Sequence, residues 1–126
     1  MPGHETHALG PTLAEVTNAI VRLHSTHYGK GPTRSKSYLI DDVLMCVMRD
    51  VFTTVERTLI ESGDGDKVRE TRLAFHDAMS GRLTEAIART LGRKVVGCTT
   101  QVLLDQDVAI EVFVLEPVSD RRRGVG

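Results

Sequence analysis

The chain has 126 residues, of which 40% are hydrophobic and 26% are charged, the balance of an ordinary globular protein. Its 16 basic and 17 acidic residues give a formal net charge of -1, which argues against a general binder of nucleic acid or anionic membranes. A chain of this length fits one domain and can bury a core without disulfides. Aromatic residues make up 4% and tryptophan is absent, so we expect an aliphatic core.

Several features predict a cytoplasmic protein. No apolar stretch approaches the roughly 20 residues that a bilayer-spanning helix needs. Residues 1–10 lack the charged-then-apolar pattern of a signal peptide. Cys46 and Cys98 lie in apolar, strand-like runs, so we expect both thiols to be reduced and buried. Such a protein would reach a membrane only through a partner.

A flexible arm and a helix are predicted at the N-terminal end. Residues 1–10 are polar and contain glycine, which is typical of a loose arm. Thr12 and Glu15 have the spacing of a capping box, which predicts a helix start. From Leu13 onward, apolar residues recur every three or four positions, so one helix face is apolar. The Gly-Lys-Gly-Pro run at 29–32 should end the helix.

A β-hairpin and a short helix should follow. Residues 35–40 and 43–48 read as strands joined by a tight turn of two aspartates. The second strand is apolar on both faces, so we expect it to be central in a sheet or covered on both sides. Thr53 and Glu56 then predict a capping box that opens the short helix.

A long amphipathic helix is predicted from about Lys67 to Leu91, capped by Asp66 and closed by Gly92. Its expected apolar stripe consists of Val68, Phe75, Met79, Leu83, Ile87 and Leu91. The charged residues between these positions, Arg72 among them, are expected to face water.

The last two strands complete the fold prediction. Residues 94–104 and 108–115 predict a second hairpin, with Gly97 marking a bulge. Glu111 interrupts an otherwise apolar face of the last strand. The order α-β-β-α-α-β-β predicts an α+β fold, with a four-stranded, mainly antiparallel sheet and helices packed on one face.

This fold sets the expected domain limits and oligomeric state. We expect one domain over residues 11–117, followed by a disordered basic tail at 118–126 that contains three consecutive arginines. A long amphipathic helix beside a small sheet often leaves apolar surface uncovered. A homodimer would cover it, and a twofold pair is the commonest arrangement.

Candidate chemistry is sparse. His24 and His27 place two imidazoles one helical turn apart, a spacing that can chelate a metal. No cysteine or carboxylate motif accompanies them, and a helix C-terminus favours histidine in any case. They are weak candidates, and we predict no metal and no cofactor. The chain also has no Gly-x-Ser-x-Gly, His-Glu-x-x-His or Cys-x-x-Cys motif, so we predict that it is not an enzyme.

The glycine-rich turn from Gly29 to Arg34 offers a second function. Lys30 and Arg34 could gather with nearby basic residues into a surface that binds RNA or another anionic ligand. The turn is not a phosphate-binding Walker A loop, because it follows a helix and precedes a strand. A solvated turn with ordinary surface charges explains it as well. Anion binding is therefore the alternative function, and the net charge makes nucleic acid the less favoured ligand.

Five segments together carry a family resemblance: 20–23, 27–32 (His-Tyr-Gly-Lys-Gly-Pro), 38–42, 53–59 and 112–117 (Val-Phe-Val-Leu-Glu-Pro). With Arg72 and residues 92–96, they make the chain resemble the MpsC-like family, small bacterial proteins of unknown function, over residues 12–117. The family name implies association with a sodium-translocating, membrane-potential-generating system. The resemblance implies an accessory or regulatory role and no catalytic residues.

The resemblance and the turn together give an expected ligand or partner surface. Its members are Gly29, Lys30, Gly31, Pro32, Arg34, Asp42, Glu56 and Arg72. Turn and cap chemistry would explain most of these residues equally well.

Overall fold

The structure, a computed structural model, describes residues 10–117. Its elements are α2 (Gly10–Tyr28), β1 (Arg34–Ile40), β2 (Val43–Arg49), α3 (Thr54–Glu61), α4 (Gly65–Leu91), β3 (Val95–Leu103) and β4 (Val108–Leu115). This order confirms the predicted α-β-β-α-α-β-β arrangement and the α+β fold. Residues 1–9 of the predicted arm and the whole predicted tail, 118–126, lie outside the described residues.

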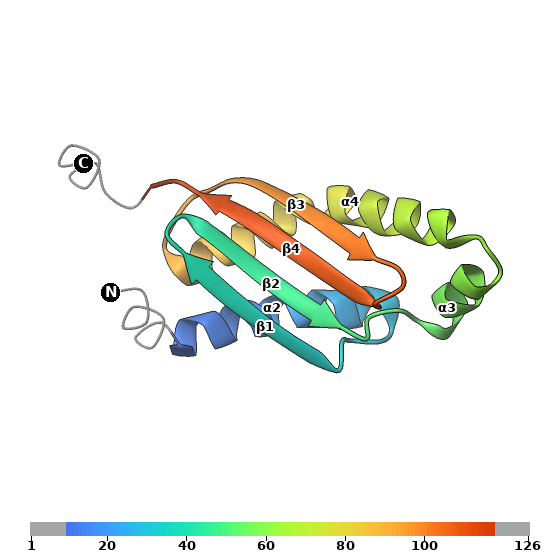
Figure 1. Ribbon diagram of the computed structural model, residues 1–126. Helices are drawn as coiled ribbons and strands as arrows, with labels where there is room; N and C mark the ends of the chain where they lie inside the picture. Colours follow the sequence, from blue (N-terminus) through green and yellow to red (C-terminus); the bar gives the residue numbers. More distant parts are fainter. Residues whose placement is uncertain (1–9, 118–126) are drawn as a thin grey trace.

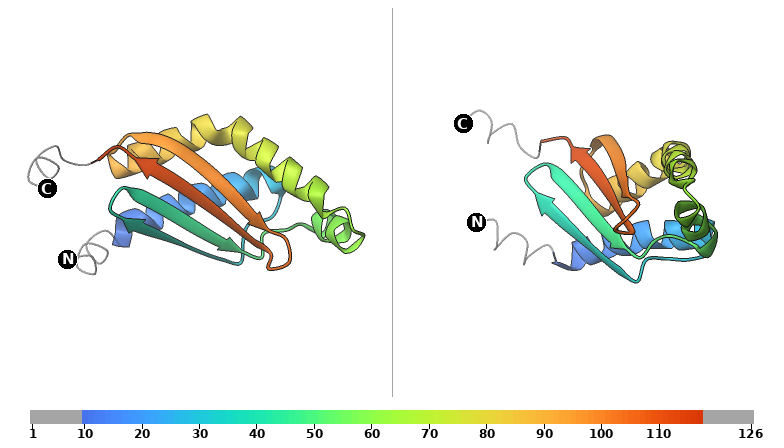
Figure 2. Two further views of the ribbon diagram at one scale, coloured as in Figure 1. Left: turned by 45° about the horizontal axis from the view of Figure 1, so that its top comes forward. Right: turned by 45° about the vertical axis from the view of Figure 1, so that its right-hand side comes forward.

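The four strands form one antiparallel sheet with the order β1-β2-β4-β3. The helices α2 and α4 lie side by side across one face of this sheet, and α3 lies at one end (Figures 1 and 2). Strand β2 is central, as its two apolar faces predicted. No helix among the described residues is both long and apolar enough to cross a membrane.

The core lies between the sheet and the two long helices. The strands β2 and β4 contribute Leu44, Cys46, Met48, Ala109, Phe113 and Leu115. The helices contribute Leu13, Val16, Ile20, Val68, Leu83 and Ile87. Apart from Phe113 and Phe52, these side chains are not aromatic, so the core is aliphatic as the composition predicted.

The opposite face of the sheet has no layer of described residues over it (Figure 1). We call it the open face. Alternation along the strands places mainly apolar side chains there. They are Tyr38, Ile40, Val43, Met45, Val47, Ile110, Val112 and Val114.

Helix α2 begins earlier than predicted. It starts at Gly10 rather than after Thr12, so Thr12 and Glu15 lie inside the helix and do not cap it. The first turn contains a proline, residue 11, whose missing N–H costs nothing where helical amides are unpaired anyway. The capping box predicted there is therefore wrong.

The second capping box is confirmed. The N–H of Glu56 donates to Oγ1 of Thr53 at 3.2 Å, and the N–H of Thr53 donates to Oε1 of Glu56 at 2.9 Å. These two bonds satisfy amides that the start of α3 would otherwise leave unpaired.

The two ends of α4 differ in how well the sequence predicted them. Its N-terminal end comes two residues before Lys67, at Gly65, and Asp64 rather than Asp66 is the cap residue. Gly92 closes the helix as predicted, because its φ of 68° lies in the left-handed region that glycine adopts without strain. The predicted bulge at Gly97 is also present, as a register shift between Val95 and Gly97.

Candidate functional site

A group of polar side chains lies buried between α2, α4 and the sheet. It consists of His24, Glu56, Arg72, His76 and Glu111, which are 6%, 9%, 5%, 8% and 3% exposed. We call these five residues the polar cluster. Buried charges are costly unless they are paired, so each member should have a partner in the others or in the backbone.

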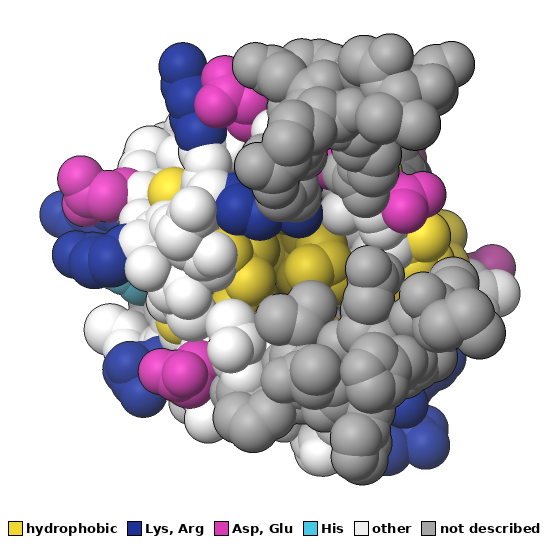
Figure 3. Space-filling view, turned by 90° about the vertical axis from the view of Figure 1, so that its left-hand side faces the viewer, with side chains coloured by type: hydrophobic (Ala, Val, Ile, Leu, Met, Phe, Trp, Pro, Cys, Tyr) yellow, Lys and Arg dark blue, Asp and Glu magenta, His cyan; other side chains and the backbone are white. Residues whose placement is uncertain are grey.

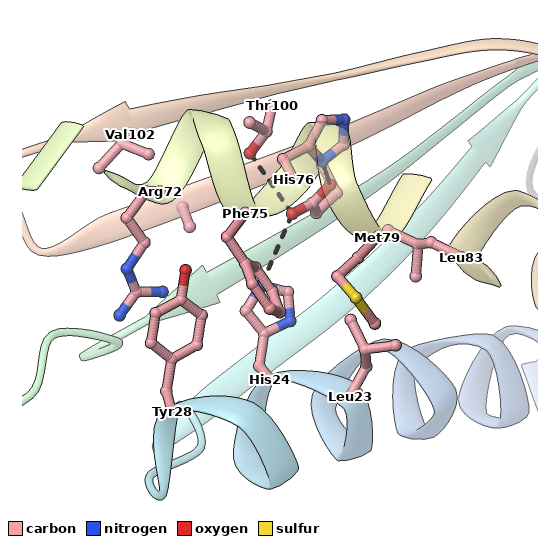
Figure 4. Close-up of a pocket in the computed structure, with 12 residues that line it drawn as sticks. Leu23, His24, Tyr28, Arg72, Phe75, His76, Met79, Leu83, Thr100 and Val102 are labelled. Carbon is pink, nitrogen blue, oxygen red and sulfur yellow. Dashed lines mark hydrogen bonds and ion pairs between the residues drawn. The ribbon is translucent and has the colours of Figure 1, made fainter. Parts of the chain in front are cut away.

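Glu111 is the centre of one half of the polar cluster. Its Oε1 lies 3.0 Å from Nδ1 of His76 on α4, and its Oε2 lies 3.6 Å from Nε2 of His24 on α2. The hydroxyl of Thr100 on β3 donates to Oε2 at 3.4 Å and to the carbonyl of Ile110 at 3.2 Å. One carboxylate on β4 therefore links both helices to the sheet, through the His24 and His76 side chains that Figure 4 labels.

The two histidines have opposite electrostatic environments. The contact with Glu111 raises the pKa of His76 above its usual value of 6.5, although burial opposes it. Burial lowers the pKa of His24, and the neighbouring Arg72 and His76 act in the same direction. The distances agree with these directions, because Glu111 lies 3.0 Å from His76 and 3.6 Å from His24. The surroundings therefore favour the protonated form of His76 over that of His24.

Arg72 and Glu56 form the other half. The Nε of Arg72 donates to Oε2 of Glu56 at 2.7 Å, and its Nη2 donates to Oε1 at 2.6 Å, a two-pronged pair. Nη2 also donates to the carbonyl of Val51 at 3.0 Å, and the guanidinium lies 3.7 Å from the ring centre of Tyr28. The expectation that Arg72 faces water is therefore wrong, because its carboxylate partner compensates for its burial.

Burial alone would raise the pKa of Glu56. The bonds from Arg72 and the bonds at Thr53 outweigh burial, so the pKa of Glu56 falls below its usual value. The charge of Glu56 thus supports the pair with Arg72 and the cap of α3 at once.

The space beside the polar cluster is very small. Tyr28, Phe75, Met79 and aliphatic side chains enclose it with the polar residues (Figure 4), and its volume is about 10 Å³. That volume is about the space one water molecule needs. The buried hydroxyl of Tyr28 has no hydrogen-bond partner among the described residues, and burial raises its pKa to about 12. Titratable groups converge here, but the space has no room for a substrate.

A thiol, an imidazole and a carboxylate are nonetheless aligned. Sγ of Cys98 on β3 lies 3.6 Å from Nε2 of His76, whose Nδ1 faces Glu111. Cys98, His76 and Glu111 are thus placed like the nucleophile, the base and the orienting group of a catalytic triad. Burial raises the pKa of Cys98, which disfavours the reactive thiolate. Cys98 is only partly buried, whereas full burial was expected, and Cys46 is buried as predicted.

Alkylation rates test whether Cys98 is activated. We expect iodoacetamide at pH 8 to modify Cys98 several-fold more slowly than a small free thiol, because fewer thiolates form. Cys46, whose pKa burial raises to about 11, should stay unmodified in the folded Cys98→Ala variant. Mass spectrometry over time gives both rates. Modification of Cys98 faster than the free thiol would mean that His76 and Glu111 activate it.

The residues of the expected surface lie in separate places. The turn from Gly29 to Arg34 joins α2 to β1, while Asp42 lies in the β1–β2 turn at the other end of β1 and bonds Arg93 at 2.6 Å. Glu56 and Arg72 are paired in the interior. The eight residues therefore do not form one surface.

The basic residues of the turn divide into two groups. The Nζ of Lys30 donates to the carbonyl of Asp50 at 2.5 Å and to that of Gly31 at 3.3 Å. Asp50 also bonds Arg57. Lys30 therefore holds the loop after β2 by a hydrogen bond, whereas Arg34 is exposed on β1.

His24 and His27 do not share a site. Nδ1 of His24 donates to the carbonyl of Ile20 at 3.0 Å, and the other ring nitrogen faces Glu111. His27 is exposed, with its ring 5.3 Å from that of Phe75. Within residues 10–117, no three histidine, cysteine or acidic side chains are placed to hold a metal ion.

Two features of the sequence could have indicated the polar cluster, but we did not predict it from them. Glu111 stands in an apolar strand face, which identifies a carboxylate directed at the core. Val68, Arg72 and His76 recur every four residues on α4, and all three are buried. Together these positions indicate that charged side chains are buried. Which of them pair with one another depends on the strand order, which the sequence does not give.

One of three comparisons with known proteins identifies a family. Over 113 residues the chain is 21% identical to the "Uncharacterized protein YrhF" of Bacillus subtilis (strain 168), covering 88% of this chain and 93% of that relative. No solved structure matches. Residues 10–117 match the family described as "Na+-translocating membrane potential-generating system (MpsC)". That match takes in all three helices and all four strands of the described residues, and the chain belongs to the MpsC family.

Proposed function

We propose that the protein is a non-enzymatic accessory or regulatory component of a cation-translocating, membrane-potential-generating system. It acts in the cytoplasm as a homodimer and reaches the membrane through a partner. The observation that carries this proposal is the open face, where eight apolar side chains lie on one side of a two-layer fold. Patches of this kind on small domains mark protein contacts. The type of system in this proposal comes from the family description, which names a Na+-translocating, membrane-potential-generating system.

The polar cluster supports a role in contact rather than in turnover. Its strongest pair, Arg72 with Glu56, binds α4 to the start of α3, and Glu111 binds β4 to both long helices. A cavity of about 10 Å³ admits no organic substrate to these groups. The cluster therefore fixes how the helices sit on the sheet, and so fixes the shape of the open face.

Capture from the native host tests this role. A tagged chain, treated with a short cross-linker under gentle detergent conditions, should recover an integral membrane subunit of a cation-translocating system. A tagged unrelated domain of the same size is the control. Repeated recovery of the tagged chain without any such subunit would contradict the proposal.

Binding of an anionic ligand is the alternative, and one observation favours it. Arg34 and Arg49 are direct cross-strand partners, and Lys36 lies on the same face of β1, so three exposed cations gather at one end of the open face. Titration with single-stranded RNA at increasing salt tests this reading. Salt-sensitive binding that Arg34→Gln and Arg49→Gln weaken, but Lys30→Ala leaves intact, would favour it.

A further inference from the structure

We infer that a second copy of this chain covers the open face, with the basic end of each copy over the acidic end of the other. This inference rests on the homodimer in the proposed function, and it names the surface and the orientation that the dimer uses.

The middle of the open face is apolar on β2 and β4, whereas β3 contributes the polar Thr99 and Gln101. The register places Tyr38 beside Met45 and Met45 beside Val112, while the next row joins Val47 to Ile110. These are the side chains that a second sheet would cover in a two-sheet core. They lie on strands whose other side is already buried, so they form a stiff surface that needs little ordering on association.

The two ends of the open face differ in charge. At one end, Arg34 pairs with Arg49 across the strands, and Lys36 follows one row inward. At the other end, the β1–β2 turn carries Asp41, which is exposed, and Asp42, which is paired with Arg93 at 2.6 Å.

Apolar side chains also reach the surface at the acidic end. Figure 3 looks onto this end of the molecule and shows hydrophobic side chains there, with acidic and basic ones around them. Ile40, Val43 and Val114 of this end are 68%, 37% and 44% exposed. The apolar surface therefore extends from the middle of the sheet to the turn that carries Asp41.

Charge decides between the two twofold arrangements of stacked sheets. An axis along the strands would place Arg34 and Arg49 against the same residues of the second copy. An axis across the strands places them over Asp41 of the second copy, and does so twice because the contact is symmetric. Like charges in contact oppose association, and opposite charges favour it and fix the orientation. The second arrangement is therefore the one that the surface permits.

The size of the open face sets the expected affinity. Four strands spaced about 4.8 Å apart, with a rise of about 3.3 Å per residue over a seven-residue strand, give roughly 440 Å² in projection. Two copies would bury about 900 Å² in total, the size of a weak, transient interface. We therefore expect a dissociation constant in the micromolar range and a dimer that dilution separates.

Sedimentation of the purified chain at several concentrations tests the surface. The wild type should associate, and Val112→Glu, which places a charge in the middle of the open face, should raise the dissociation constant at least about 30-fold. Circular dichroism should show that this variant stays folded, because the open face of a monomer meets water. The matched control is Leu73→Glu, which changes a 39% exposed residue on the helical layer and should leave the dimer intact.

Charge removal tests the orientation. Arg49→Gln and Asp41→Asn should each weaken the dimer, by about 2- to 5-fold, and the double variant should weaken it by less than the product of the two. Asparagine suits position 41, whose φ of 52° is left-handed. If Arg49→Gln strengthens the dimer, the orientation is wrong.

The remaining outcomes separate this inference from the proposed function. A dimer that survives Val112→Glu means that another surface, such as an exposed strand edge, joins the copies, and the inference fails. A wild type that stays monomeric at several hundred micromolar removes the inference and the homodimer together. Neither result bears on whether the chain captures a membrane subunit, which the cross-linking experiment measures.

Discussion

Replacing Arg72 with leucine should lower the free energy of unfolding by about 3–5 kcal/mol, because it leaves the carboxylate of Glu56 buried without its cation. For a chain of this length, that loss corresponds to a fall of roughly 10–20 °C in Tm. Urea denaturation followed by circular dichroism measures the change. The variant also loses the bond to the carbonyl of Val51 and the contact with the ring of Tyr28.

Two further variants make this result specific. Arg69→Leu lies on the same helix, but its ion pair with the 95% exposed Asp66 is a surface contact, so it should cost less than about 1 kcal/mol. Glu56→Gln keeps the capping-box geometry and removes the charge, so Arg72→Leu/Glu56→Gln should be more stable than Arg72→Leu alone. A loss below about 1 kcal/mol for Arg72→Leu would show that the pair does not hold α4 to the start of α3.

The two histidines of the polar cluster should give opposite pH dependence. In His24→Gln, His76 remains, with a folded pKa above its unfolded value of 6.5. Its contribution to stability is fully present below pH 6.5 and is lost as the pH rises through the folded pKa. In His76→Gln, His24 remains, with a folded pKa below 6.5. This variant should lose stability as the pH falls from 6.5 through that folded pKa.

The measurement is the free energy of unfolding from pH 8 to pH 5 for both variants. Each histidine contributes a slope of at most about 1.4 kcal/mol per pH unit, so the variants should differ clearly although the wild type shows a smaller net change. Groups outside the polar cluster affect both variants equally. The groups that face the histidines, Glu111, Arg72 and Cys98, remain in both. Equal slopes would mean that Glu111 does not distinguish the two imidazoles.

The fold was largely predictable because it depends on local signals. The uninterrupted apolar run of residues 43–48 predicted a central strand, and Gly92 closes α4 with the left-handed geometry that favours glycine. The start of α2 was not predictable from Thr12 and Glu15, because a capping box is optional where a helix can begin earlier. Helix boundaries are the feature that local patterns define least.

The interior chemistry was not predictable for a different reason. Arg72 belongs to a charged set on α4, and sequence alone gives no indication that Glu56, sixteen residues earlier, neutralises it in the interior. Glu111 and His76 meet only because β4 lies between β2 and β3 beneath α4. Pairing of this kind depends on tertiary arrangement, whereas the spacing of residues along α4 shows only which side chains share a face.

The two sides of the sheet have different roles in the proposed function. The polar cluster holds two helices on one side of the sheet, and the apolar residues of β1, β2 and β4 on the other side remain for a partner. In the proposed function, the protein acts through the shape and chemistry of this surface. Its variants should therefore divide into those that change stability, such as Arg72→Leu, and those that change association, such as Val112→Glu.

Exposure of methyl groups to a dissolved paramagnetic probe tests the working surface most directly. In methyl-labelled protein, the signals of Val47, Ile110 and Val112 should be shielded from the probe at high protein concentration and become exposed on dilution. The methyl groups of Val55, which is 70% exposed outside the open face, should stay exposed throughout. Signals from Val47, Ile110 and Val112 that broaden equally at every concentration would contradict a covered open face.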